Sequence, residues 1–147
     1  MNKILLSLVF TTAFWSCKSD EDTVSQAEKG VFAIHDEIMP KIDDIMKLKK
    51  QLKLRITTLD SLKASGSAAA TLRVDEEKEQ ATRLSRDLTV ADSLMMDWMG
   101  SYNSDTLAKL PSEEALNYLA AQKDQITDVK TKVNTSIEQS RQFLGKK

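Results

Sequence analysis

The single histidine and several methionines are the residues of this chain whose spacing suggests a metal or cofactor site. His35 and Met39 are four residues apart, so on a helix they share one face. If the chain folds back near Gly66, Met95 and Met99 come to the same end. Imidazole and thioether ligands suit Cu(I), and a His–Met pair inside a helical bundle can hold haem. The alternative, which we favour, is an irregular bundle end filled by adaptable methionines, with one hydrogen-bonded histidine and no cofactor.

Motifs of the common catalytic classes are absent from the sequence. It contains no GxSxG, HExxH or P-loop, and no CxxC, CxxCH or Cys/His spacing typical of zinc or haem attachment. No nucleophile stands near a base, and no pair of carboxylates is set apart from the solvated helix faces. We therefore expect a protein that is not an enzyme.

The one cysteine, Cys17, ends an apolar N-terminal segment. An apolar stretch of twelve residues follows a short basic start and is too short to span a bilayer. It ends in Phe14-Trp15-Ser16-Cys17, which resembles a bacterial lipobox, where a peptidase cuts before a cysteine that carries the lipid. Ser16 fits the small residue at the cut, whereas Phe14 and Trp15 depart from the usual pattern. The resemblance implies a signal peptide over residues 1–16 and a lipid anchor on Cys17; the alternative is an ordinary secretory signal with an incidental cysteine.

The residues after Cys17 are short, polar and mostly acidic. Lys18, Ser19, Asp20, Glu21 and Asp22 are similar to the export signal that sends Bacteroidota-type lipoproteins to the outer face of the outer membrane. This similarity implies an outer-membrane lipoprotein exposed at the cell surface, with residues 17–23 as a lipidated acidic tether. The alternative is a solvated acidic tether without a sorting role.

Four Asp-Ser/Thr-apolar triplets resemble the O-glycosylation sequence of Bacteroidota-type exported proteins. Their hydroxyl residues are Thr23, Ser61, Ser93 and Thr106. Three residues carry little information, since Asp-Ser before a core leucine is also natural on a helix. The tether and the loop make Thr23 and Thr106 the exposed candidates.

Apolar residues recur at helical spacing through three long segments, which we expect at about residues 24–64, 68–100 and 112–145. Pro40 lacks a backbone N–H, so it predicts a kink in the first helix near residues 36–39, or a helix start there with a looser segment before it. The apolar positions of the first segment recur every seven residues, at Val24, Val31, Ile38, Ile45, Leu52 and Leu59.

Turn and cap residues separate these segments. Gly66 suits the position after a helix end and Ser67 suits an N-cap. Residues 103–111 predict a loop, with at most one short turn at 105–109. Ser112 is expected to cap the third helix, with acidic residues in its first turn.

Length and composition favour one all-α domain. The 147 residues include only four glycines and two prolines, which favours long helices over a turn-rich β fold. Three helices joined by short loops predict an antiparallel, coiled-coil-like three-helix bundle. The net charge of −1 gives no electrostatic reason to expect a nucleic-acid partner.

Folding about Gly66 also predicts which residues lie level with one another. His35 should lie beside Asp97 and Trp98, with the methionines and most aromatic residues gathered at that end. The basic run at 47–55 should lie beside the acidic run at 75–79, as a paired and solvated surface. The alternative for the basic run is a patch that binds phosphates or lipid headgroups.

Two stretches, Ile34 to Lys53 and Asp92 to Tyr102, resemble short, helix-rich Bacteroidota-type lipoproteins. Such proteins often carry a label borrowed from viral A-type inclusion protein, which reflects coiled-coil-like composition and implies no known activity. We therefore expect a lipid-anchored helical module that interacts with an unknown protein partner or with its own copies. The alternative function is a small-ligand or metal-binding bundle that uses the end around His35.

Overall fold

The computed structural model describes residues 20–65 and 68–145, which form helices with no strand among them. In chain order the elements are α1 (Asp20–Ile38), the 3-10 turn η1 (Met39–Lys41), α2 (Ile42–Ser65), α3 (Ala68–Ser101), α4 (Ser104–Leu107) and α5 (Ser112–Phe143). The four long helices α1, α2, α3 and α5 pack against one another, which confirms the predicted all-α bundle. Gly66 and Ser67 lie outside the described residues, as do residues 1–19, which include the expected signal peptide, Cys17, Lys18 and Ser19.

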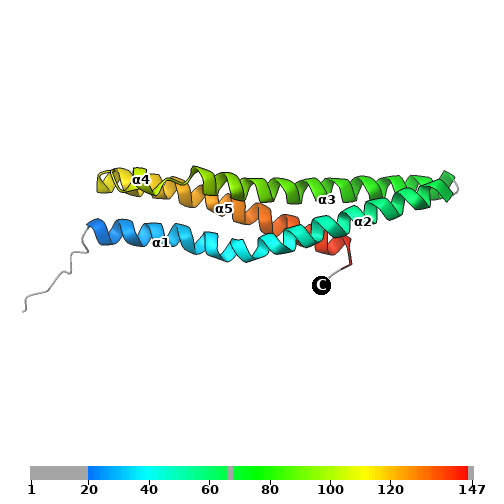
Figure 1. Ribbon diagram of the computed structural model, residues 1–147, viewed down its shortest axis with the longest axis horizontal. Helices are drawn as coiled ribbons and strands as arrows, with labels where there is room; N and C mark the ends of the chain where they lie inside the picture. The colour runs from blue at the N-terminus through cyan, green and yellow to red at the C-terminus, as the bar shows by residue number, and fades with distance from the viewer. Residues whose placement is uncertain (1–19, 66–67, 146–147) are drawn as a thin grey trace, which may run out of the picture.

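The long helices lie along one elongated rod (Figure 1). α1 and α2 run in one direction, α3 runs back, and α5 runs in the first direction again. α3 is antiparallel to α2, because Arg55 bonds Glu77 whereas Lys63, further along α2, bonds Asp75. α5 runs parallel to α1 and α2, with ion pairs joining Glu37 to Lys130 and Asp44 to Arg141.

The apolar stripes form the core of the rod. Five of the six heptad positions expected in the first segment are buried, and Val24 at its start is partly buried against the core. α3 and α5 contribute the facing residues of this core: Ala81, Leu84, Leu88, Ala91, Met95 and Trp98 from α3, and Ala115, Leu119, Ile126, Val129, Val133 and Ile137 from α5. Because the stripe continues from α1 into α2, both helices share one core in spite of the break between them.

Pro40 breaks the first long segment at residues 39–41, which overlap the predicted range of 36–39 only at Met39. The break is the turn η1, where Pro40 occupies one of the first positions and its missing N–H leaves no helical hydrogen bond unmade. The change of direction lets α1 follow α5 while α2 follows α3 (Figure 1). The expected single helix is therefore two helices with different neighbours.

Two boundary predictions were wrong. α1 begins at Asp20, so residues 20–23 of the expected tether form its first turn, where the helix dipole favours Asp20, Glu21 and Asp22. Ser112 is the first residue of α5 and not its cap, because Pro111 takes that position without a side-chain hydrogen bond. Within the connection before α5, the side chain of Asn103 caps α4 by accepting the N–H of Thr106 at 2.8 Å.

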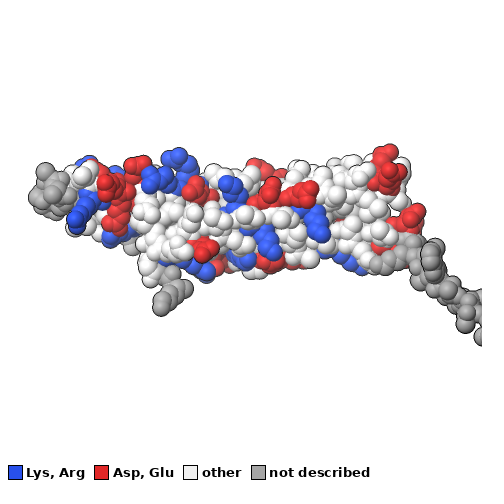
Figure 2. Space-filling model, turned by 180° about the vertical axis from the view of Figure 1, so that it is seen from behind, with Lys and Arg blue, Asp and Glu red and all other residues white. Residues whose placement is uncertain are grey.

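Only α2 and α3 form one end of the rod, whereas α1, α3 and α5 meet at the other end. The last turn of α5 lies level with Asp44 of α2 and Gln80 of α3. Beyond it, residues 52–65 of α2 and 68–79 of α3 continue as a hairpin, which we call the arm (Figure 1). Lys, Arg, Asp and Glu side chains are mixed along the surface shown in Figure 2, with no large area of one sign. No helix in the described part of the chain is long and apolar enough to cross a membrane.

Candidate functional site

Five rings meet at the end of the rod opposite the arm, from α1, from the end of α3 and the residue that follows it, and from α5. This aromatic cluster consists of Phe32 and His35 of α1, Trp98 and Tyr102, and Tyr118 of α5. Centroid distances are 5.6 Å for His35–Trp98, 5.5 Å for Trp98–Tyr102 and 6.0 Å for Tyr102–Tyr118. Phe32 meets Tyr102 edge to face at 5.1 Å. These separations are typical of favourable ring pairs.

The cluster joins α1 to α3 where their backbones lie apart, with α1 on the far side of the rod from α3 (Figure 1). Only large side chains reach across this distance, and Trp98 is 4% exposed at the centre. The contact between His35 and Trp98 confirms the register predicted from folding about Gly66. Trp98 Nε1 has no hydrogen-bond partner among the described residues, so ring packing holds this indole in place.

A hydrogen bond between Tyr102 and Glu28 closes the cluster on the α1 side. Tyr102 donates its hydroxyl proton to Glu28 Oε1 at 2.8 Å. Burial raises the pKa of Tyr102 far above its usual value, and the hydrogen bond and charge of Glu28 raise this pKa further. Nothing in the sequence singles out Glu28, although it lies on the same helical face as Phe32 and His35.

His35 is a packed and hydrogen-bonded residue in this structure. Its Nδ1 lies 2.9 Å from Asp36 Oδ1, and its side chain is 19% exposed. The ring is tilted over Trp98 and lies edge-on to Phe32. The Asp36 side chain, which is 76% exposed, turns back toward the ring of its sequence neighbour to make this bond.

The methionines proposed as ligands differ in burial. Met95 is fully buried in the core, Met99 is partly buried, and Met39 is 36% exposed in η1. Met96, expected at the same end, is 58% exposed. Among residues 20–65 and 68–145 no three His, Cys, Asp or Glu side chains gather as a metal site. Copper and haem ligation by His35, Met39, Met95 and Met99 stay predictions.

An open groove of about 730 Å³ runs between α3 and α5 beside the cluster. We call it the α3–α5 groove; Trp98 and Val129 form its buried lining, and Leu94 adds an apolar side chain that is 37% exposed. Asp97, Asp128 and Lys132 add charges at its sides. The groove includes neither His35 nor a methionine, so its lining does not fit a haem held by those residues.

The expected modification sites are all helical and exposed. Thr23 lies in α1, Ser61 in α2, Ser93 in α3 and Thr106 in α4. The aspartates that precede the two central sites are engaged, since Asp60 pairs with Lys78 and Asp92 with Lys49. Glycosylation at any of the four stays a prediction.

The basic run of α2 is paired only in part with the acidic run of α3. Arg55 donates to Glu77 at 2.7 Å, as the register predicted. Lys49 pairs instead with Asp92 at 3.7 Å, further along α3. Lys50 and Lys53 form no ion pair with a described residue, so the expected pairing holds for Arg55 and not for these two lysines. Helix geometry is the reason, because residues 50 and 53 point away from the α3 side of α2.

Comparison of the chain with protein-family models, with curated proteins and with solved structures finds no match.

Proposed function

We propose that the chain is a non-enzymatic lipoprotein of the small, helix-rich Bacteroidota type. Cys17 anchors it to the outer membrane, exposed at the cell surface, and the bundle acts as a structural or interaction module. The observation that carries the proposal is the position of α1, which begins at Asp20, three residues after Cys17. The exposed acids of its first turn belong to the stretch that resembles the export signal.

The shape of the rod supports an interaction role. Residues 20–65 would extend about 69 Å at the rise of an α-helix, so a module anchored at one end reaches far beyond its attachment point. The arm lies at the end opposite the start of α1 (Figure 1). The α3–α5 groove adds an open surface along the side of the rod.

Lipid attachment is tested by expressing the chain in a Bacteroidota host fed an alkyne-tagged fatty acid. We expect the label on the natural chain and none on the Cys17→Ser variant, with globomycin blocking the cleavage. Surface exposure is tested by adding protease to intact cells. Processing that continues in globomycin, or a Cys17→Ser variant that is still labelled, would contradict the proposal.

A further inference from the structure

The side of α2 that points away from the bundle is basic and partly apolar. We call it the α2 outer face; its residues are Met46, Lys47, Lys50, Lys53 and Leu54, spaced so that they share one side of the helix. All five are exposed, and the exposed fractions of Met46 and Leu54 are 56% and 68%. Two large apolar side chains among lysines are typical of a helix that rests on an anionic surface.

The lysines of this face are left over when the bundle forms its ion pairs. The inward-facing cations of the basic run are engaged, Lys49 with Asp92 and Arg55 with Glu77. Lys47 is 70% exposed and has only a long contact of 3.9 Å to Asp44 on its own helix. The positive charges of Lys47, Lys50 and Lys53 are therefore available to another molecule.

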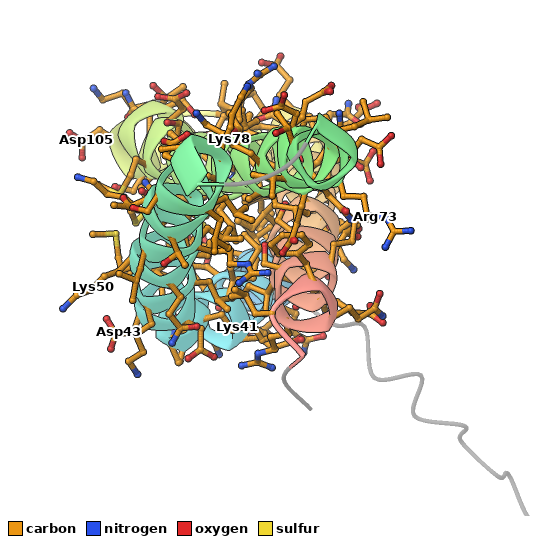
Figure 3. All side chains as sticks on the ribbon, turned by 90° about the vertical axis from the view of Figure 1, so that its right-hand side faces the viewer. Lys41, Asp43, Lys50, Arg73, Lys78 and Asp105 are labelled. Atoms are coloured by element: carbon orange, nitrogen blue, oxygen red, sulfur yellow. The ribbon has the colours of Figure 1, made fainter. Side chains whose placement is uncertain are left out.

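One acid lies at the edge of this face. Asp43 projects from the same side of α2 as Lys50, and both point away from the other helices (Figure 3). From residue 46 to residue 58 the outward positions carry no acidic side chain, so the three lysines outweigh Asp43.

We propose that the α2 outer face binds the anionic headgroups of the membrane that holds the lipid on Cys17, so that the rod lies along the bilayer. This inference rests on the proposed function. Each lysine close to an anionic leaflet contributes about 1 kcal/mol of attraction, which is about fivefold in a binding constant. Met46 and Leu54 enter the headgroup region, where amphipathic helices bury their apolar side chains.

The distance between the anchor and this face makes the proposal specific. Asp20 and Lys50 are separated by thirty residues, or about 45 Å of helix. Charges are screened beyond about 8 Å at physiological ionic strength. A rod standing upright on its anchor would therefore hold these lysines out of range, and the attraction acts only when the rod lies flat.

The flat orientation leaves the other side of the rod open. α2 and α5 lie on opposite sides of the rod in the end view (Figure 3). With α2 against the membrane, α5 faces away from it. A protein partner would then meet the side that carries α5.

The test uses the full acylated protein reconstituted into vesicles of phosphatidylcholine alone or mixed equally with phosphatidylglycerol. A polarity-sensitive fluorophore is attached to a cysteine at Thr57→Cys on the outward side of α2, and in a second sample at Thr127→Cys on α5. The two sites are matched, because each threonine is exposed and bonds the carbonyl four residues earlier. We expect increased fluorescence at position 57 on the anionic vesicles only, reversed by salt, and none at position 127.

Substitution of the lysines gives the second measurement. Changing Lys47, Lys50 and Lys53 together to glutamine should weaken the flat state about fivefold per lysine and remove the signal at position 57. The control changes Lys109, Lys123 and Lys132, which are exposed elsewhere, to glutamine and should leave the signal intact. Unchanged circular dichroism and thermal midpoints will show that both variants fold.

The possible failures are distinguishable. Protein that does not float with either kind of vesicle would contradict the lipid anchor and thus the proposed function. Protein that floats but shows the same signal at position 57 with and without phosphatidylglycerol would overturn the flat orientation alone. A larger response to soluble heparin than to anionic vesicles would also overturn it, in favour of a polysaccharide.

Discussion

The aromatic cluster and the arm fill the space between their helices with different kinds of side chain. At the cluster, α1, α3 and α5 meet, and rings such as Trp98 and Tyr102 fill the wide space between backbones. In the arm only α2 and α3 meet (Figure 1), and the buried side chains among its described residues are those of Leu52 and Leu59. Ion pairs then run along the seam of the arm.

The difference indicates where the stability of the rod is concentrated. Buried rings contribute several kcal/mol each, whereas exposed ion pairs contribute less than about 1 kcal/mol. Two helices also bury less apolar surface per residue than three. We therefore expect the cluster end to hold the fold and the arm to open first.

The largest effect is expected from Trp98→Ala. Removing the central ring of the cluster leaves a cavity among three helices and should lower the free energy of unfolding by about 3–5 kcal/mol. Urea unfolding followed by circular dichroism measures this change. The control is Met96→Ala on the exposed side of the same helix, which should cost less than about 0.5 kcal/mol. Equal losses in the two variants would show that the ring is not central to the fold.

Leu59→Ala tests the arm. Leu59 is 1% exposed, but the two-helix hairpin can close partly around the missing side chain, so we expect a loss near the lower limit for leucine, about 2 kcal/mol. Hydrogen exchange should accelerate at residues 52–65 and much less around Trp98. The exposed Leu54→Ala is the matched control. Exchange that accelerates equally in both regions would mean that the rod unfolds as one unit.

Tyr102→Phe removes the hydrogen bond to Glu28 and should cost about 1.5 kcal/mol near neutral pH, the lower value for a bond to a charged group. It should also change the pH dependence. Because the pKa of Tyr102 is raised in the folded protein, the unfolded chain ionises first, near pH 10. The stability from this group is complete below about pH 10 and is lost as the pH rises above it.

Unfolding at several alkaline pH values measures this loss. The natural chain should lose stability more steeply above about pH 10 than the Tyr102→Phe variant does. Tyr118→Phe, which removes the hydroxyl that accepts the N–H of Asn103, should retain most of the steep slope, because Tyr118 is the smallest of the causes that raise the pKa of Tyr102. Parallel curves for the natural chain and Tyr102→Phe would contradict the assignment.

The smallest effect is expected from the ion pair between Arg55 and Glu77 in the arm. A double-mutant cycle with alanine at each position should give a coupling below about 1 kcal/mol, which decreases as salt is added. The pair is partly exposed, at 41% for Arg55 and 36% for Glu77. A coupling as large as the loss in Tyr102→Phe would remove the distinction between the two regions.

The sequence by itself determined the elements and the core. The seven-residue apolar repeat and Pro40 are local signals, because helix periodicity and the missing N–H act on the chain before any tertiary contact forms. Few glycines and the expected turn residues Gly66 and Ser67 then left little alternative to a folded-back bundle, and that register put His35 beside Trp98. Helix ends were less certain, as Asp20 and Ser112 show, since the energies of neighbouring cap positions differ little.

Only the tertiary structure decided which charges are paired and which are left exposed. Lys49 and Lys50 are neighbours in one basic run, yet Lys49 reaches Asp92 of α3 and Lys50 points away from the bundle. Glu28 likewise gained its role only when Tyr102 came within 2.8 Å. These outcomes depend on how each helix is rotated about its axis relative to its neighbours. The packing of the whole core determines this rotation, so it cannot be read from one segment of the sequence.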